Sequence, residues 1–255
     1  MPLRRLAARY IYIYALGASL PDPADILQFL EAGRAPGESV EIELTLTRVR
    51  NTTERLDEYN GGQGPGARRR YRVLDNGAGA SIVEMLDPID RGSRILATGD
   101  DLWFFTPRTR RAIRIPPAQR VFGDASYGDL ARLRWRNDYD VAFDTTPETS
   151  LDGHACWRLQ LTARSPAATY RHVILWVRQS DWLPMRAAYY VASGKLLKTV
   201  TFPQARVVNG RLQNDVWVIS AEGSAGHQTL LSIESVTPRA FPEHQFTRRY
   251  LELNP

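Results

Sequence analysis

Apolar and polar side chains alternate along the first half of the chain, beginning at residues 38–50. Val40, Ile42, Leu44 and Leu46 share one face of that segment, while glutamate and threonine side chains share the other. Such alternation predicts a β-strand with one buried face. Similar short runs, separated by turn-forming sequences, follow at 68–75, 80–87, 93–98, 101–106 and 111–115. Short strands joined by tight turns predict an antiparallel meander.

The alternation stops at residues 116–138, within which 126–135 predicts one or two helical turns. Ser126 suits the N-cap of these turns, and Asp129 three residues later completes a capping box. Alternating runs then return at 139–144, 156–163, 171–177, 185–192, 195–202, 215–220 and 229–236. The pattern predicts one mainly β domain over residues 21–255, with roughly a dozen antiparallel strands in a sheet that must curl, close or split. A curled sheet has a concave face, and the function is expected there.

A short helix is predicted before the first strand, over residues 25–32. Asp22 or Asp25 can cap it, and Gly33 is expected to end it. Its apolar stripe consists of Ile26, Leu27, Phe29 and Leu30. Residues 246–252 predict a last short helix or an extended tail.

The first twenty residues have the order of a secretory signal, because Arg4, Arg5 and Arg9 precede an apolar run at 10–20. An edge strand or a misassigned start are the alternatives. The run is too short to span a bilayer, and no other stretch is long and apolar enough to do so.

Composition supports a folded core, with 43% hydrophobic and 24% charged residues. The formal net charge is +5, and all but two of the 33 basic residues are arginine. These arginines are spread along the chain and interleaved with carboxylates. The basicity therefore indicates a weak attraction to anionic surfaces such as lipid headgroups, and no nucleic-acid site.

The sequence contains few candidates for catalytic or metal-binding motifs. Cys156 is the only cysteine and lies in an apolar strand pattern, which is typical of a buried, inert thiol. The segment at 123–129 has a serine between glycines, but not at the spacing of a nucleophile elbow. The glycine-rich segment at 61–66 predicts a hairpin loop. No histidine has a partner at metal-ligand spacing among His154, His172, His227 and His244. We therefore predict no catalytic residue, metal site or cofactor.

Residues 87–133 carry a resemblance to a known family. A glycine–aspartate turn leads into an aromatic strand that ends at proline (99–107, GDDLWFFTP), and a basic strand follows (110–115, RRAIRI). The sequence FGDASYGDL (122–130) closes the next loop. These blocks resemble the LolA-like branch of the LolA/LolB-like outer-membrane lipoprotein-sorting superfamily, and the likeness extends over residues 22–253.

The resemblance implies an unclosed antiparallel β half-barrel with a helical lid over an apolar cavity. It also implies a periplasmic, non-catalytic carrier of the acyl chains of lipoproteins or other lipids, without a cofactor. The implied partners are an inner-membrane transporter and an outer-membrane acceptor, with only transient contact at a membrane surface. The lid is expected from residues 25–32 and 116–136.

Individual residues can be proposed for the two parts of this cavity. The expected lipid-binding wall comprises Val40, Ile42, Leu44, Leu46, Leu102 and Phe104. The lid candidates are Ile26, Phe29, Leu30, Phe122 and Leu130.

Carriers that receive lipoproteins from a transporter have an arginine near the third strand that is linked to release. Arg68, Arg69 and Arg70 occupy that neighbourhood here, and the sequence does not choose among them. Two alternatives remain open at this point. One is a regulatory module that senses lipids or lipoproteins, and the other is a β-barrel enzyme acting on lipid or sugar, in which His172 or Glu84 would cluster with other polar groups.

Overall fold

The computed structural model describes residues 20–34, 39–50, 67–132, 135–208, 210–224 and 226–254. The signal-like segment before residue 20 and the glycine-rich segment at 61–66 lie outside the described residues. The helices are α2 (Pro23–Arg34), α3 (Tyr127–Ala131), α4 (Trp135–Asp138), α5 (Arg248–Leu253) and the 3-10 helix η2 (Glu243–Phe246). The strands are β1 (Val40–Arg50), β2 (Arg68–Asp75), β3 (Ser81–Met85), β4 (Arg94–Thr98), β5 (Asp101–Phe105), β6 (Ala112–Arg114), β7 (Arg120–Phe122), β8 (Ala125–Ser126), β9 (Tyr139–Leu151), β10 (His154–Ala163), β11 (His172–Arg178), β12 (Pro184–Tyr190), β13 (Leu196–Val208), β14 (Arg211–Ala221) and β15 (His227–Pro238).

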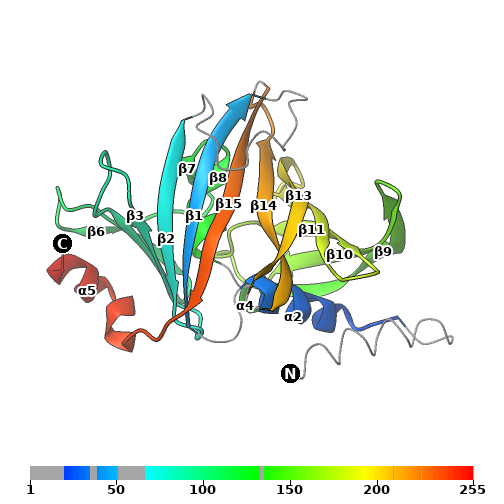
Figure 1. Ribbon diagram of the computed structural model, residues 1–255, viewed down its shortest axis with the longest axis horizontal. Helices are drawn as coiled ribbons and strands as arrows, with labels where there is room; N and C mark the ends of the chain where they lie inside the picture. Colours follow the sequence, from blue (N-terminus) through cyan, green and yellow to red (C-terminus); the bar gives the residue numbers. More distant parts are fainter. Residues whose placement is uncertain are drawn as a thin grey trace.

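Thirteen of the described strands form a single antiparallel sheet that curls without closing (Figure 1). Its order is β6-β5-β4-β3-β2-β1-β15-β14-β13-β12-β11-β10-β9, so β6 and β9 are the free edges and β1 pairs with β15 in the middle. The remaining two strands, β7 and β8, pair only with each other. The predicted fold class, an unclosed antiparallel half-barrel with a few short helices, is confirmed.

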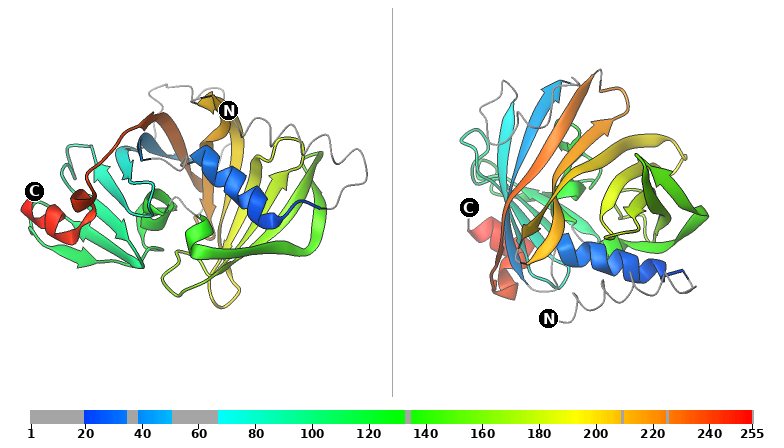
Figure 2. Two further views of the ribbon diagram at one scale, coloured as in Figure 1. Left: turned by 90° about the horizontal axis from the view of Figure 1, so that it is seen from below. Right: turned by 45° about the vertical axis from the view of Figure 1, so that its right-hand side comes forward.

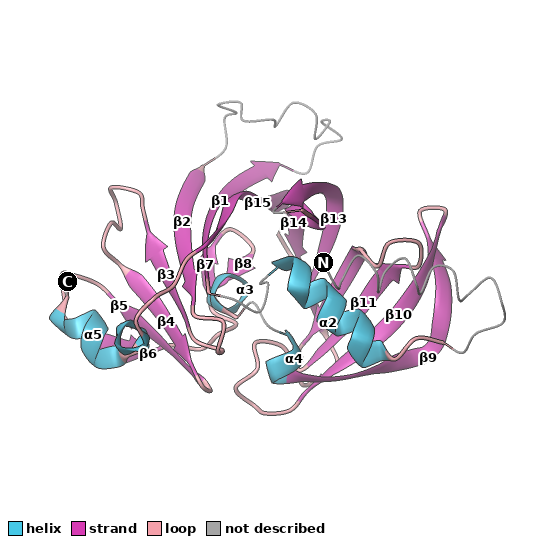
Figure 3. Ribbon diagram, turned by 60° about the horizontal axis from the view of Figure 1, so that its bottom comes forward, coloured by secondary structure: helices cyan, strands magenta, loops and turns pink. Residues whose placement is uncertain are grey.

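The chain crosses the hollow of the sheet once, between its two edges. From β1 it steps outward, strand by strand, to the edge at β6. Residues 115–138, which contain β7, β8, α3 and α4, then lead to the opposite edge at β9 (Figures 1 and 3). From β9 the strands return to the middle at β15. The segment that covers the hollow is therefore also the connection between the free edges.

The two faces of the sheet have separate apolar clusters. The inner cluster contains side chains from most strands together with those of α2 and α3, such as Leu27 and Leu130. A smaller outer cluster lies where α5 and η2 pack on β4–β6, and its buried members are Ile82, Leu96, Phe105, Ala112, Phe246 and Leu251. Figure 3 shows α2, α3 and α4 in the hollow and α5 outside it. Among the described helices, none combines the length and the apolar character needed to span a bilayer.

The predicted elements are found, but the extents of several differ. Residues 116–138, where the alternation stops and helical turns were expected, also contain the short hairpin of β7 and β8. Strands of two or three residues are too short to show an alternating pattern. Gly33 does not end α2, which continues to Arg34, while Asp22 caps its start by accepting a hydrogen bond from the Ala24 N–H at 2.8 Å. Strands β9 and β13 are several residues longer than their alternating runs.

Candidate functional site

The inner face of the sheet brings the expected wall and lid residues into one apolar cluster. The β1 side chains and Leu102 are buried in it, and Phe104 packs against it partly exposed. Of the lid candidates, Ile26, Leu30 and Leu130 are buried members, while Phe29 and Phe122 pack against the cluster from its margin. Whether these residues contact a lipid stays a prediction.

Helix α2 lies across the opening of the more strongly curled half of the sheet (Figure 2). It contacts β14 on one side, β9 on the other and α4 beside it, although four strands separate β14 from β9 in the sheet. Its apolar stripe faces the hollow, because Ile26, Leu27 and Leu30 are buried. Phe29 contacts Trp182 edge-on, with ring centroids 5.5 Å apart. The helix thus closes a trough whose wall at this point is aromatic.

Among the described residues, the void between α2 and strands β12–β14 is small. It has a volume of about 30 Å³ and is bordered by Phe29, Leu30, Phe202 and Trp217. Such a void holds about one or two water molecules. A ligand pocket usually has about 300–1,000 Å³. This void is therefore too small for an acyl chain unless the helix moves away from the sheet.

Two larger hollows formed by described residues have mixed polar and apolar linings. One, of about 320 Å³, lies at the ends of β2–β5 beside α3 and is bordered by Gly79, Ser81, Asp100 and Arg132. The other, of about 650 Å³, involves strands from β9 to β15 and includes Thr199 and Gln228. Neither has the mainly apolar lining that hydrocarbon requires.

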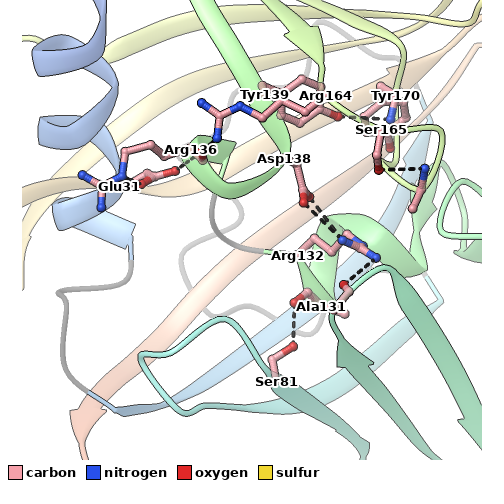
Figure 4. A network of polar contacts seen from close by, with 12 residues as sticks. Glu31, Ser81, Ala131, Arg132, Arg136, Asp138, Tyr139, Arg164, Ser165 and Tyr170 are labelled. Atoms are coloured by element: carbon pink, nitrogen blue, oxygen red, sulfur yellow. Dashed lines mark hydrogen bonds and ion pairs between the residues drawn. The ribbon is translucent and has the colours of Figure 1, made fainter.

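A polar network ties α2 to the rest of the cover (Figure 4). The buried Glu31 carboxylate of α2 accepts a hydrogen bond from the Arg136 N–H of α4. Arg132 pairs with Asp138 at 3.2 Å, and burial raises the pKa of Asp138 against the opposing effect of that guanidinium. The Ser81 hydroxyl donates to the Ala131 carbonyl at 2.5 Å, which fixes α3 to β3. The network holds the cover at its polar rim, while the apolar stripe fills the trough.

The sequence FGDASYGDL (122–130) packs against the trough wall with little free space. A Cβ on Gly123, whose φ is +54°, would overlap the Thr229 side chain, and one on Gly128 would overlap Thr169. The Asp124 N–H donates to Thr229 Oγ1 at 2.8 Å. Glycine is therefore required at both positions by close approach to the wall.

The predicted capping box on α3 is confirmed. Asp129 Oδ2 accepts from the Ser126 N–H at 2.7 Å, and the Asp129 N–H donates to Ser126 Oγ at 3.3 Å.

The same carboxylate forms a buried ion pair with Lys198 of β13. The Tyr170 hydroxyl donates to Asp129 Oδ1 at 2.8 Å, and the Lys198 ammonium lies 4.9 Å from the Tyr170 ring and 5.4 Å from that of Tyr189. Burial opposes ionisation of Asp129, but the ammonium and the hydrogen bonds from Ser126 and Tyr170 lower its pKa. This cluster joins the cover to the strongly curled half of the sheet.

Sequence reasoning missed this pair, although β13 carries a signal for it. Lys198, Val200 and Phe202 are buried on one face of the strand, so a lysine occupies an apolar position of the alternation. A charge on the buried face of a strand requires a partner, because an unpaired ion is too costly to desolvate.

Comparisons with known proteins agree with this geometry. A family model described as "-like: Uncharacterized protein" matches residues 77–253. The crystal structure of a LolA superfamily protein from Nitrosomonas europaea is similar over 91% of this chain and 100% of that one, at 28% sequence identity and a TM-score of 0.78. The chain belongs to the LolA-like superfamily.

Two further solved structures share the LolA-like fold. A DUF1329 family protein from Desulfovibrio piger has 18% identity and a TM-score of 0.69, covering 91% of this chain and 100% of its own. A putative outer membrane lipoprotein-sorting protein domain from Vibrio parahaemolyticus has 17% identity and a TM-score of 0.66, covering 89% and 97%. A comparison with curated proteins gives no match.

Of the three arginines that precede Tyr71 in this LolA-like chain, only Arg69 shares its inner face. The Arg69 guanidinium lies over the Phe122 ring at 5.5 Å. Arg68 and Arg70 point outward to Glu234 and Asp87, with nitrogen–oxygen distances of 3.4 and 3.5 Å. Burial raises the pKa of nearby Asp90, and Arg69 opposes that rise. Among these three arginines, Arg69 is therefore the one on the inner face of the sheet.

The two polar residues whose clustering in the hollow would favour an enzyme, Glu84 and His172, both lie on the outer face of the sheet. Glu84 pairs with Arg72 at 3.5 Å on the outer face. His172 alternates with the buried Val173 and so also lies on the outer face of β11. Within the described residues, no group of three or more histidine, cysteine, aspartate or glutamate side chains could hold a metal ion.

Proposed function

We propose that this protein is a periplasmic carrier that binds the acyl chains of lipids or lipoproteins beneath α2 without altering them. The observation that carries the proposal is the placement of α2. A helix with a buried apolar stripe spans an aromatic trough between β14 and β9. The LolA superfamily relative and the lipoprotein-sorting domain support the same function.

The free energies of the open and closed states are compatible with reversible loading. Burial of a chain of about 16 carbons is worth on the order of 10 kcal/mol, at about 0.8 kcal/mol per CH₂. Opening exposes Ile26, Leu27 and Leu30, which costs about 5–9 kcal/mol at about 1.5–3 kcal/mol per side chain. Exposure of the helix stripe therefore offsets a large part of the free energy gained by burying the cargo. A carrier needs such an offset, because cargo held much more tightly could not be released.

The polar network at the rim adds a specific point of opening. Glu31 and Arg136 join α2 to α4, and this is one polar contact that breaks when the helix lifts. Arg69 and Phe122 lie at the inner face of the other half of the sheet. We assign to Arg69 an influence on release of the cargo, and to an inner-membrane transporter and an outer-membrane acceptor the roles of donor and recipient.

Native mass spectrometry tests the proposal directly. The purified protein is expected to carry a fatty acid or phospholipid, and delipidated protein is expected to take up a fluorescent fatty acid and return it chemically unchanged. Protein that is free of lipid and takes up none refutes carriage. Recovery of a cleaved or modified lipid refutes the non-catalytic part alone, and cell fractionation tests the compartment.

A matched pair of variants on α2 tests the lid. Leu27 is buried and Gln28 is exposed on the same helix turn. Leu27→Ala should weaken docking of the helix by at least about 2 kcal/mol, which raises the open population about 30-fold. Transfer of the fluorescent fatty acid to acceptor vesicles should accelerate accordingly. Gln28→Ala should leave the rate unchanged, and equal rates in the two variants would rule out α2 as the lid.

A further inference from the structure

The hairpin ends at the β6 edge of the sheet carry an exposed group of arginine and isoleucine side chains. The β3–β4 turn contributes Ile89 and Arg91, and the β5–β6 hairpin contributes the rest. We call this group the rim patch, and its members are Ile89, Arg91, Arg108, Arg110, Arg111 and Ile113. Both hairpins lie at the left of Figure 1, far from β9. A Cβ on Gly92 would lie 2.9 Å from the Pro107 ring, so the two hairpin ends are in contact.

The rim patch leaves two large aliphatic side chains in water. Ile89 is 77% exposed and Ile113 is 57% exposed. Single exposed apolar residues are ordinary, but here both stand among four arginines. Aliphatic side chains surrounded by cations are the combination that binds an anionic lipid surface, by shallow insertion together with charge attraction.

Most of the positive charge of the patch is unpaired within the described residues. Arg91, Arg108 and Arg110 make no ion pair with any described carboxylate, and all are exposed. Neighbouring carboxylates are engaged elsewhere, since Asp87 pairs with Arg70, Asp101 with Arg114 and Glu252 with Arg248. Asp90, in the same turn as Ile89 and Arg91, is the acidic residue within the patch, and the four arginines outnumber it. Glu252 also lies close enough to Arg111 for that guanidinium to contribute to lowering its pKa.

The hairpin tip holds its arginines in a defined turn. The N–H groups of Thr109 and Arg110 both donate to the Thr106 carbonyl, at 3.2 and 3.0 Å. Arg110 has a φ of +54°, a left-handed conformation that costs free energy for any residue with a side chain. The turn therefore holds the backbone of Arg108 and Arg110 in a fixed conformation. Little further backbone entropy would be lost when these residues bind a membrane.

The rim patch also borders the half of the hollow that α3 covers. Ile113 is the register partner of Phe104, whose ring lies 6.0 Å from that of Tyr127 in α3. Asp90, next to Ile89 and Arg91, contributes to raising the pKa of Tyr127, so the turn lies beside the same helix. A membrane that touches the patch is thus adjacent to the cover over β2–β5.

We propose that the rim patch docks this protein on anionic bilayers, through its arginines on lipid phosphates and through Ile89 and Ile113 in the interface. The docking deepens the carrier function, because it holds the carrier at the surface of a membrane that donates or receives the acyl chain. The docking proposal rests on the proposed carrier function, but the vesicle-binding test does not require bound cargo.

Co-sedimentation with vesicles measures the docking. The full-length protein is incubated with vesicles of phosphatidylcholine, alone or mixed with phosphatidylglycerol, at low and high salt. Binding is expected only to the anionic vesicles and should weaken with salt. Arg108→Gln, Arg110→Gln and Arg111→Gln combined should weaken it about 100-fold, since each arginine near a membrane contributes about fivefold, or about 1 kcal/mol.

A triple variant elsewhere on the surface provides the matched control. Arg48, Arg206 and Arg239 are exposed and lie on β1, β13 and just after β15, away from the hairpin ends. Changing all three to glutamine removes the same amount of charge. Vesicle binding should stay within about twofold of the wild type, because charges far from the docking surface are screened by salt. Ile89→Ser should reduce binding without changing its dependence on salt.

Several outcomes would overturn the docking proposal. The first is wild-type protein that does not sediment with anionic vesicles, whether or not the same arginines bind an acidic protein instead. The second is an equal loss of vesicle binding in the two triple variants. The third is unchanged vesicle binding in Ile89→Ser. Native mass spectrometry of the rim variant should still show bound lipid. Vesicle binding without any lipid cargo would refute carriage and leave docking intact, so the two failures are distinguishable.

Discussion

The buried pair between Asp129 and Lys198 should contribute strongly to the stability of the cover. Lys198 is 2% exposed, and its ammonium contacts the Asp129 carboxylate and the faces of Tyr170 and Tyr189. Replacing one member leaves the other as a buried, unpaired charge, which typically costs about 3–5 kcal/mol. The two single variants should not be equal.

Lys198→Met should fall near the lower end of that range. Asp129 would keep the hydrogen bonds from the Ser126 N–H and the Tyr170 hydroxyl, which stabilise its carboxylate. Asp129→Asn should be more costly, because Lys198 would retain mainly its contacts with aromatic rings. Asparagine also weakens the capping box of α3, by about 1 kcal/mol.

The double variant Lys198→Met, Asp129→Asn removes both charges and should therefore cost less than the sum of the single variants. A coupling of about 2 kcal/mol or more is expected, since contacting residues in one network usually couple by about 0.5–3 kcal/mol. Urea unfolding followed by tryptophan fluorescence gives the three free-energy differences. Additive costs, or single variants within about 1 kcal/mol of the wild type, would show that the pair does not hold the cover.

Three further predictions follow from the same region and from the outer strands. The pKa of Asp129 is lowered in the folded protein, so its contribution to stability is present above its unfolded pKa near 3.8 and is lost as the pH falls through its folded pKa. The difference in unfolding free energy between wild type and Asp129→Asn, measured in urea, should therefore vanish as the pH falls through that folded pKa. Gly128→Ala should cost about 1–3 kcal/mol by overlap with Thr169, and an unchanged melting temperature would contradict the close contact. Burial raises the pKa of the Cys156 thiol, so a thiol reagent should modify it only on unfolding, and rapid labelling of the native protein would be the contrary result.

The local patterns of the sequence were sufficient for most of the sheet and for α3. Alternation at 38–50 predicts both β1 and its buried face, because the period of a strand needs no information from distant residues. The capping box is equally local, since Ser126 and Asp129 are three residues apart. The hairpin of β7 and β8 could not be predicted in this way, because its strands are defined by packing in the hollow.

The candidate site was predictable in composition but not in arrangement. The wall and lid residues do gather in one cluster, yet only coordinates show that α2 reaches from β14 to β9 and leaves almost no space beneath it. Asp129 and Lys198 are 69 residues apart, and nothing in either segment specifies the other. Similarly, the rim patch requires contact between two hairpins that a sequence shows only as separate turns.

The route of the chain through the hollow has a mechanical consequence. Residues 115–138 are joined at one end to the β6 edge and at the other to the β9 edge, so they connect the two free edges of the sheet across its hollow. Pushing this segment outward must pull on both margins and change the curvature of the whole sheet. Helix α2 precedes the first strand and is not part of this connection. On the carrier proposal, displacing α2 would leave the connection between the two edges intact, whereas displacing residues 115–138 would change the width of the hollow.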